Sequence, residues 1–444
     1  MIEFSPEAVA IIMLIGLIVA IFTGFPLALA VGSIGIFMGL LTRGLSAVDI
    51  TYYQVFSKIH SYTLLAVPMF VFMGSILEAS GMAEKMFQAL FVVLGRLRGG
   101  LALSTVVVGT VIATCVGVIS ASVSMLTLVA LPAMIRRGYS KSLASGTVAA
   151  SGTLGILIPP SIMLVVIGPL SGLSVGKLFA AAFPPGFLLA GVYMVYVVIR
   201  CAISERMGPP VTGEEASIPL GARLQLLVRS IVPPLIVVVA VLGSILLGLA
   251  SPTEAAAFGA FATTIMVIGY RKFTLAALKN ALNDTMKVTG MALLIATLSV
   301  AYTSVFLALG GGEIVTNAIL AVPGGRWGSF ALIMFIVFIL GMFLDWMGIV
   351  FVIVPILLPA NTVLGFDLLW FIMMVVVNIQ TGFLSPPFAM ALFILRGTAD
   401  PSLGIEFGDM IRGVLPFIAC VFAVLVLCAI FPEIILWLPR VTFG

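Results

Sequence analysis

Two apolar segments, each long enough to cross a membrane, are interrupted by glycines and a pair of prolines. The interruptions read Gly152-Thr153-Leu154-Gly155-Ile156-Leu157-Ile158-Pro159-Pro160-Ser161 and Thr381-Gly382-Phe383-Leu384-Ser385-Pro386-Pro387. A broken helix exposes backbone polar groups, which a bilayer tolerates only where protein or a water-filled cavity surrounds them. Two such breaks at corresponding places in two halves of a chain indicate the substrate site of a secondary transporter.

Composition places the whole chain in a membrane. The 444 residues are 62% hydrophobic and 9% charged, whereas a soluble domain carries about 25% charged residues. The sequence therefore predicts one all-α, polytopic integral membrane unit over residues 1–444. The acidic N-terminus lacks the basic region of a signal peptide. The four cysteines show no metal-ligand spacing, so we expect neither a cofactor nor a transition-metal centre.

Apolar runs define the predicted spans, each of which needs about 20 residues. Candidates lie at residues 8–22, 25–41, 62–79, 142–168, 176–200, 230–249, 254–270, 288–308, 367–395 and 403–436. Two further stretches, 101–135 and 328–359, are too long for one crossing and carry polar or small residues at their centres. We interpret both as re-entrant hairpins with tips at 120–124 and 345–348.

The pattern of hairpin, broken helix and long apolar helix occurs twice, which predicts two inverted-topology repeats. The first repeat covers 62–200, with hairpin 101–135 and broken helix 142–168. The second covers 288–436, with hairpin 328–359 and broken helix 367–395. Residues 201–287 form a scaffold segment between them, and its polar stretch Ser204–Arg229 is interpreted as a cytoplasmic loop.

Basic residues predict the orientation, because cytoplasmic loops are enriched in Lys and Arg. With the N-terminus outside and both hairpins returning to their own side, all but five of the 21 basic residues fall inside. The five outer residues are Arg43, Lys58, Lys177, Arg326 and Arg440. Both termini are therefore expected on the outer face.

Three shorter patterns add structural expectations. Glu84–Leu90 and Glu313–Ile319 precede the hairpins and are too polar or too short to span, so we interpret them as interfacial arms that link a stationary part to a moving part. Ser251-Pro252-Thr253-Glu254 predicts a capping box that starts a helix, rather than a chemical site.

Asp345 is the most informative charged residue, because it lies within an apolar hairpin. A carboxylate inside a membrane costs at least about 2.5 kcal/mol on insertion scales and normally has a task. Asp345 suits binding of a cation, and it equally suits capping of the hairpin's second helix. Both roles are compatible.

Hydroxyls occupy the first hairpin where the second has Asp345. Sodium suits hydroxyl oxygens and the carbonyls of unwound helices, whereas a lone membrane serine more often bonds its own helix. Clustering at a broken turn favours the ligand role. The candidates are Ser120, Ser122 and Ser124 facing Ser151, Gly152 and Thr153, and Asp345 facing Thr381, Gly382 and Ser385.

Helices that restart after each tip and break point their N-termini at mid-membrane, where they attract anions. A sodium-coupled site for an organic carboxylate follows as a hypothesis, although no Lys or Arg lies deep in a predicted span. We expect substrate contacts from Ser124, Ser161, Asn378 and Ser385. Asn378, with Gln380, equally suits sealing of the broken helix.

The ordered motifs resemble the large, DctM-like membrane subunit of tripartite ATP-independent periplasmic (TRAP) transporters over essentially the whole chain. The motifs are Pro68-Met69-Phe70-Val71-Phe72-Met73-Gly74, Ser120-Ala121-Ser122, the first interrupted segment, Ser251-Pro252-Thr253-Glu254-Ala255, Gly341-Met342-Phe343-Leu344-Asp345 and Pro386-Pro387. The resemblance implies an elevator-type sodium symporter in a bacterial inner membrane. It also implies a separate small four-helix subunit and a periplasmic protein that delivers a carboxylate or sialic-acid-like substrate.

The resemblance further implies where sodium binds. Its sodium sites correspond to Ser120, Ser122, Gly152, Thr153, Asp345, Gly348, Thr381 and Gly382.

The alternative function is a stand-alone anion symporter or antiporter of the same superfamily. An enzyme is not expected, because the lone His60 offers no catalytic dyad with a membrane serine. A channel suits two inverted hairpins less well than alternating access does.

Overall fold

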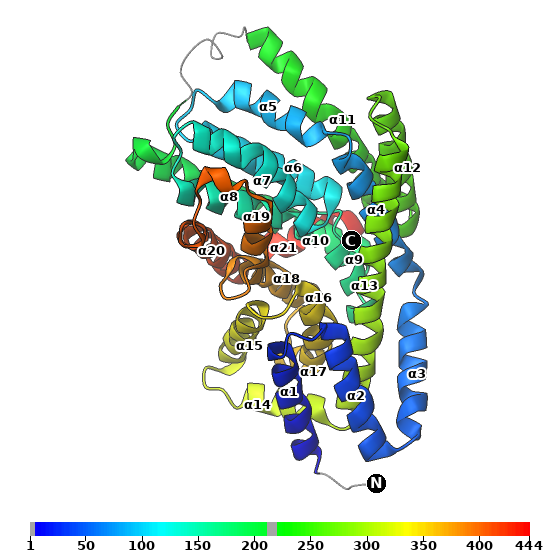
Figure 1. The fold of residues 1–444 in the computed structure, drawn as a ribbon. Helices are drawn as coiled ribbons and strands as arrows, with labels where there is room; N and C mark the ends of the chain where they lie inside the picture. The colour runs from blue at the N-terminus through cyan, green and yellow to red at the C-terminus, as the bar shows by residue number, and fades with distance from the viewer. Residues whose placement is uncertain (1–4, 211–219) are drawn as a thin grey trace.

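The computed structural model describes residues 5–210 and 220–444, without the side chains of residues 83, 113, 115, 116, 220 and 224. Its regular elements are helices (Figure 1). The first half contains α1 (Pro6–Phe22), α2 (Leu27–Arg43), α3 (Ser46–Ile59), α4 (Ala66–Glu78), α5 (Met82–Leu94), α6 (Gly100–Val116), α7 (Ile119–Arg136), α8 (Lys141–Thr153), α9 (Ile162–Ser171) and α10 (Val175–Ile203). The second half contains α11 (Leu220–Leu246), α12 (Pro252–Gly269), α13 (Leu275–Ala308), α14 (Gly311–Leu320), α15 (Gly325–Gly341), α16 (Trp346–Gly348), α17 (Val354–Leu364), α18 (Leu368–Leu384), α19 (Met390–Thr398), α20 (Phe407–Ile430) and α21 (Glu433–Phe443).

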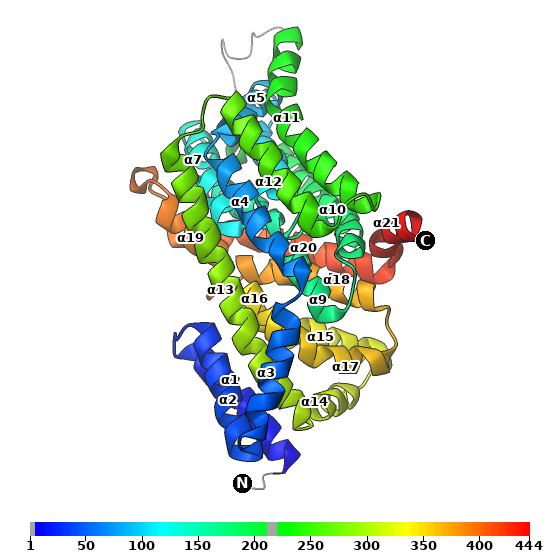
Figure 2. The same cartoon turned by 90° about the vertical axis from the view of Figure 1, so that its right-hand side faces the viewer.

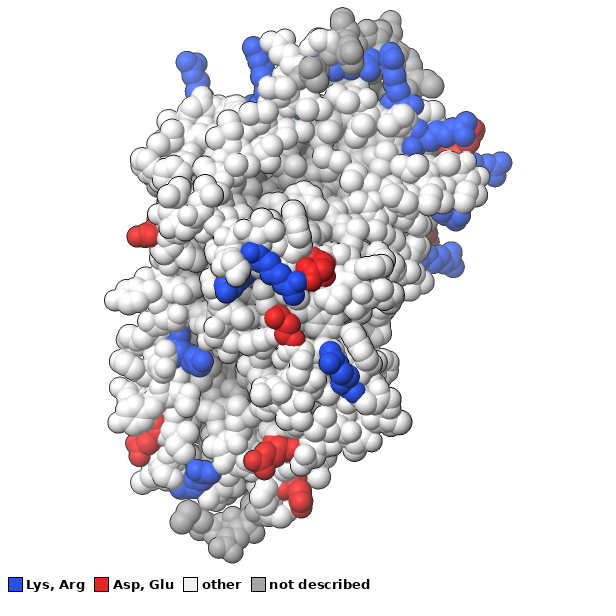
Figure 3. Space-filling view, turned by 180° about the vertical axis from the view of Figure 1, so that it is seen from behind, with Lys and Arg blue, Asp and Glu red and all other residues white. Residues whose placement is uncertain are grey.

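The helices have the length and surface of a multi-pass membrane protein. Within the described residues, seven helices are long and apolar enough to cross a membrane, and two bent helix pairs raise the number to nine. Large apolar side chains such as Phe22, Phe261 and Phe335 are exposed, which suits contact with lipid. Figure 3 shows broad uncharged areas, with Lys and Arg gathered over the upper end and upper right side.

A long helix, α13, organises one side of the molecule by packing along α2, α3 and α4 (Figure 2). Its contact with α2 is close, because a Cβ added to Gly35 would lie 2.5 Å from the Cα atom of Tyr302. The Tyr302 hydroxyl donates to the Met13 carbonyl at 3.0 Å and so attaches α1 to the same group. Small residues let helix backbones approach closely, and the resulting van der Waals contacts are a main driving force of helix association in membranes.

Helix α12 packs on α4 and begins at the predicted capping box. The Ser251 hydroxyl accepts from the Glu254 N–H at 3.3 Å, and the Glu254 carboxylate accepts from the Ser251 N–H at 2.7 Å. Two orphan donors of the helix start are thereby satisfied. The predicted capping box is confirmed.

Short helices α5 and α14 precede the two hairpins and contain the predicted arms. Each follows a glycine in the left-handed conformation, with φ of 65° at Gly81 and 85° at Gly310. Only glycine adopts this conformation freely, so the chain turns sharply where α4 and α13 end. Helix α14 meets α15 at an angle of 118°, and α5 packs against α6 and α11.

The first hairpin consists of α6 and α7, which pack against each other and are joined at Gly117-Val118. The second consists of α15 and a continuous helical run from Trp346 to Leu364, which includes the π-helical turn η5 (Ile349–Ile353) between α16 and α17. Pro132 lies inside α7 and Pro359 inside α17. Each hairpin is therefore completed by a helix that carries an internal proline.

Both interrupted helices end before their double prolines. Helix α8 ends before the 3₁₀ turn η2 (Leu154–Ile156), and the chain resumes helical structure in α9. Helix α18 ends at Leu384 and is followed by α19. The peptide bonds Pro159-Pro160 and Pro386-Pro387 are both cis.

Several predicted boundaries were wrong. Residues 46–59 form α3, which is bent by 55° from the span that follows it, and 288–308 is only the second part of α13. The span predicted at 403–436 is two helices, because the chain leaves helical structure after Ile430 and restarts at Glu433. The predicted loop Ser204–Arg229 partly coincides with α11, and its residues 211–219 lie outside the described part.

Candidate functional site

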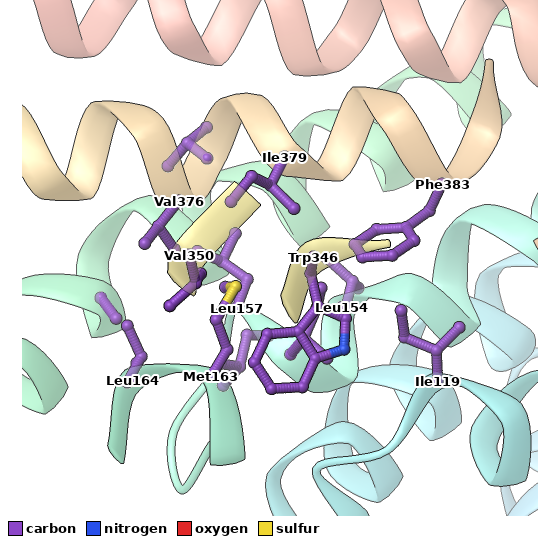
Figure 4. Packing of buried hydrophobic residues seen from close by; sticks show 14 of the residues in the cluster. Ile119, Leu154, Leu157, Met163, Leu164, Trp346, Val350, Val376, Ile379 and Phe383 are labelled. Atoms are coloured by element: carbon purple, nitrogen blue, oxygen red, sulfur yellow. The ribbon is translucent and has the colours of Figure 1, made fainter. Parts of the chain in front are cut away.

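Apolar side chains from both hairpins and both broken helices meet in one buried cluster (Figure 4). Ile119 comes from the start of α7, and Leu154 and Leu157 come from the first break. Trp346 comes from the second hairpin and Phe383 from the end of α18. Figure 4 shows the Trp346 indole between the first break and α18. Segments that belong to separate halves of the sequence therefore occupy one region.

Ser122 lies on a different face of α7 from Ser120 and Ser124. The predicted tip at 120–124 was too late, because the turn is at Gly117-Val118 and the serines belong to the first turns of the helix. Ser122 is fully buried, and its hydroxyl has no hydrogen-bond partner. Ser120 is exposed and Ser124 is half-buried. Residues two apart cannot share a helix face, so only Ser122 is enclosed.

Gly152 brings the first break against α7. A Cβ at Gly152 would lie 2.4 Å from the Val123 Cγ2 atom and 3.0 Å from its Cα atom, so any side chain there would separate the two segments. The neighbouring Ser151 hydroxyl is buried and has no hydrogen-bond partner. The contact therefore places two unpartnered hydroxyls, those of Ser122 and Ser151, on adjoining segments.

Thr153 and Thr381 make the same hydrogen bond in the two breaks. The Thr153 hydroxyl donates to the Ala150 carbonyl at 2.9 Å, and the Thr381 hydroxyl donates to the Asn378 carbonyl at 2.6 Å. Both residues are fully buried. A hydroxyl that donates its hydrogen keeps two lone pairs, so each oxygen is oriented as an acceptor or metal ligand and not as a donor.

Asp345 occupies the N-cap position of α16, and its Oδ1 atom is buried without a hydrogen-bond partner. Asp345 can therefore fill both roles that the sequence left open: it caps α16 at the positive end of the helix dipole, and it presents a free oxygen to a cation. Gly348 packs against α2, because a Cβ there would lie 2.6 Å from the Leu27 Cδ2 atom. Gly348 can contribute backbone atoms alone.

The second break packs on the end of α15. A Cβ at Gly382 would lie 2.5 Å from the Gly341 carbonyl oxygen. The Asn378 amide donates to the Met334 carbonyl of α15 at 2.6 Å, which favours its sealing role. Ser385 is buried with an unpartnered hydroxyl, and both amide atoms of Gln380 are also unpartnered. Gln380, which the sequence suggested only as a companion of Asn378, is therefore a stronger candidate ligand.

The remaining predicted substrate contacts, Ser161 and Ser124, both have partners. The Ser161 hydroxyl donates to the Ile156 carbonyl within the first break. The Ser124 hydroxyl lies 3.3 Å from the Thr398 hydroxyl of α19. The second pair connects the first hairpin to α19, the second part of the second broken helix.

A cavity that sequence reasoning missed opens beside the first hairpin, between α4, α7 and α13. It measures about 290 Å³, and its polar lining consists of Ser75, Glu78, Ser120, Ser124, Asp284 and Lys287. We call it the α4–α7 cavity. Lys287 directly precedes the predicted span 288–308, although it lies well inside α13. The sequence feature that could have pointed to this cavity is the spacing of Asp284 and Lys287, which lie one helical turn apart.

The oxygens at the two tips suit a hard cation such as sodium rather than a transition metal. Among the described side chains, no three His, Cys, Asp or Glu residues lie close enough to hold a metal ion, and the Cys115 side chain is outside that set. Some of the buried oxygens without a hydrogen-bond partner lie at the two tips: hydroxyls of Ser122 and Ser151 at the first, and oxygens of Asp345, Gln380 and Ser385 at the second. Others, those of Tyr193, Thr289, Ser299 and Asn361, lie elsewhere.

Known proteins resemble this chain in sequence and in fold. The family model described as "Tripartite ATP-independent periplasmic transporter, DctM component" matches residues 14–434. The C4-dicarboxylate TRAP transporter large permease protein DctM of Rhodobacter capsulatus is 31% identical, over 97% of this chain and 98% of its own. The sialic acid TRAP transporter permease protein SiaT of Haemophilus influenzae is 28% identical, over 99% of this chain and 69% of its own. The Alcanivorax borkumensis YdaH transporter shares the fold, with a TM-score of 0.63 and 15% identity over 89% of this chain and 90% of that one.

Proposed function

Because this chain belongs to the DctM family of tripartite ATP-independent periplasmic transporters, as a large permease subunit, we propose that it imports an organic acid together with sodium. Relatives in this family are permeases and not enzymes. The C4-dicarboxylates and sialic acid in the names of two relatives share a carboxylate group, which supports an organic anion as the substrate class. The proposal includes a periplasmic binding protein that delivers the substrate and a separate small membrane subunit.

The observation that carries sodium coupling is the pair of buried, unpartnered oxygens on Ser122 and Asp345. A buried polar atom without a partner costs about 1–3 kcal/mol, which a bound cation removes. Each oxygen lies near the start of the helix that completes a hairpin, and each hairpin lies against a broken helix. The ligand groups proposed are Ser120, Ser122, Gly152 and Thr153 for one ion, and Asp345, Gly348, Thr381 and Gly382 for the other. Ser120 would contribute its backbone, because its side chain lines the α4–α7 cavity.

An elevator mechanism is the proposed mode of transport, in which hairpins and broken helices move together against a stationary scaffold. The order α4 to α10 is matched by α13 to α20, with a short arm, a hairpin and a broken helix in each. Helix α2 packs on α13 as α12 packs on α4. Figure 1 shows the arms α5 and α14 near opposite ends of the molecule. These correspondences support two repeats of inverted topology.

We place the protein in a bacterial inner membrane with both termini in the periplasm. The bacterial sources of the relatives and the word periplasmic in the family description support the compartment. The distribution of basic residues along the sequence supports the orientation, because the outer side receives only five of 21. In spheroplasts, a tag at either terminus of the protein should be accessible from outside. A tag inserted within residues 211–219 should not be accessible.

Transport in liposomes tests the function. The permease, with its small subunit, would be reconstituted and supplied with its binding protein and radiolabelled succinate or N-acetylneuraminate. Uptake is expected only when sodium is higher outside, and a sodium ionophore should abolish it. Uptake that persists without sodium contradicts the coupling. Uptake that needs sodium but neither partner favours the stand-alone symporter instead.

A further inference from the structure

A second cavity borders the C-terminal part of α13, whereas the α4–α7 cavity borders its N-terminal part. The charges of the two cavities differ. It lies between α3, α13 and α17 and measures about 590 Å³. We call it the α3–α17 cavity. Lys58 is the only charged residue in its described lining. The α4–α7 cavity contains two carboxylates, Glu78 and Asp284, against one ammonium, Lys287. One cavity is therefore cationic and the other has a net negative charge.

Two side chains supply the hydrogen-bond donors of the α3–α17 cavity. The Lys58 ammonium donates to the Pro169 carbonyl at 3.3 Å, which holds it beside α9, and two of its three N–H groups are left for a ligand. Gln54 lies one helical turn earlier on α3 and lines the same cavity. Each of these side chains can donate to an oxygen of a carboxylate.

The cavity's hydroxyls cannot compete as donors. Those of Thr303, Ser304 and Thr362 donate to carbonyls of their own helices, at 2.9, 3.1 and 3.2 Å respectively. Their oxygens therefore present only lone pairs to the cavity. A carboxylate is itself only an acceptor, so it cannot form hydrogen bonds with them. Recognition of an anion in this cavity therefore depends on Lys58 and Gln54.

We propose that the α3–α17 cavity is an entry station where Lys58 and Gln54 bind the carboxylate of the arriving substrate, while the negative α4–α7 cavity disfavours its return. The inference rests on the proposed function, which supplies an organic anion and places Lys58 on the outer side. Fixed charges that line a cavity of low dielectric raise the local concentration of ions of opposite sign. The two cavities together make binding of an anion more favourable at the α3–α17 cavity than at the α4–α7 cavity.

The charge of each cavity can be measured without transport. Gln54→Cys and Ser120→Cys place one thiol in each cavity, and their reaction rates with an anionic and a cationic methanethiosulfonate reagent are compared in purified protein. Labelling of the unsubstituted chain is subtracted as background. The anionic reagent should be favoured at residue 54 and the cationic reagent at residue 120. Adding Lys58→Gln to Gln54→Cys should lower the anionic preference roughly fivefold, and Lys177→Gln should not. An unchanged preference with Lys58→Gln overturns the proposal.

Transport kinetics test the role of the same residue. In the liposome system with succinate or N-acetylneuraminate, Lys58→Gln should raise KM roughly fivefold with little change in kcat, and Lys58→Arg should preserve KM. Lys177→Gln is the matched control, because it removes another outer-face lysine that lines neither cavity. Absence of sodium-driven uptake by the unsubstituted protein contradicts the proposed function, whereas normal uptake with unchanged KM in Lys58→Gln overturns the entry station.

Discussion

Gly146 of α8 and Gly413 of α20 bring the two halves of the chain into backbone contact. A Cβ at Gly146 would lie 2.2 Å from the Gly413 carbonyl oxygen, and a Cβ at Gly413 would lie 2.1 Å from the Ser142 carbonyl oxygen. Backbone atoms cannot move aside as a flexible side chain can. We expect Gly146→Ala to separate the helices and to lower stability by about 1–3 kcal/mol, measured as a lower Tm of the purified protein. Gly191→Ala is the control, because its Cβ would meet nothing within 4 Å.

The two proposed sodium positions should respond differently to pH. Protonation neutralises a carboxylate but leaves a hydroxyl neutral, so acid should weaken only the position that contains Asp345. We expect Asp345→Asn to raise the sodium concentration for half-maximal uptake at least about tenfold and to remove the pH dependence of that value. Ser122→Ala should raise the value while its pH dependence stays.

Asp367→Asn is the control for this comparison, because Asp367 also occupies a helix N-cap but accepts a hydrogen bond from the Trp370 N–H at 2.9 Å. Its sodium dependence should match that of the unsubstituted protein. Sodium dependence that is unchanged in Asp345→Asn would exclude this carboxylate from the ion position.

Tyr139 joins the start of α6 to the turn between α7 and α8. Its hydroxyl accepts from the Leu101 N–H at 3.2 Å, and burial is the main cause that raises its pKa to about 12. Tyr139→Phe leaves the N–H without this partner, so we expect a loss of about 1–3 kcal/mol of unfolding free energy. Because the folded-state pKa is raised, the loss should be constant in ordinary buffers and shrink only in strong alkali. Tyr62→Phe, at an exposed residue, should leave Tm unchanged.

Asp400 stabilises the turn between α19 and α20. Hydrogen bonds from the backbone and side chain of Ser402, the N–H bond at 2.8 Å first, and to a lesser extent the charge of Arg136 hold the pKa of Asp400 below its ordinary value. A lowered carboxyl pKa stabilises the folded state at neutral pH, and this contribution disappears as pH falls through the folded-state pKa. The Tm difference between the unsubstituted protein and Asp400→Asn should therefore shrink on acidification. A difference that grows in acid would contradict the assignment.

The sequence could locate the breaks because glycine and proline act on their own backbone. Helix α18 stops at Leu384, two residues before Pro386, which lacks the donor that a helix needs. Helix α8 stops at Thr153, a few residues earlier than its double proline, and the prolines keep the chain from resuming a regular helix before Ile162. The capping box at Ser251 is equally local. The arms could be located because they combine charge with short length. Features of this kind need no knowledge of the tertiary fold.

Other features depend on packing between distant segments. Which of the three serines at 120, 122 and 124 is enclosed depends on how α7 is rotated, and the contact of Val123 with Gly152 fixes that rotation. Lys58 and Lys287 looked like charges at the ends of spans. They line cavities only because α3, α7, α13 and α17 come together, and no local pattern contains that arrangement.

The Trp346 side chain gives the two proposed ion positions a common wall. Trp346 directly follows Asp345, and Leu154 directly follows Thr153. Figure 4 shows the indole beside the first break. We expect an ion at the proposed second position to order that tip and the indole with it, which would leave less conformational entropy for the first position to lose. Sodium binding should therefore be cooperative, with a Hill coefficient above one that Trp346→Ala reduces toward one.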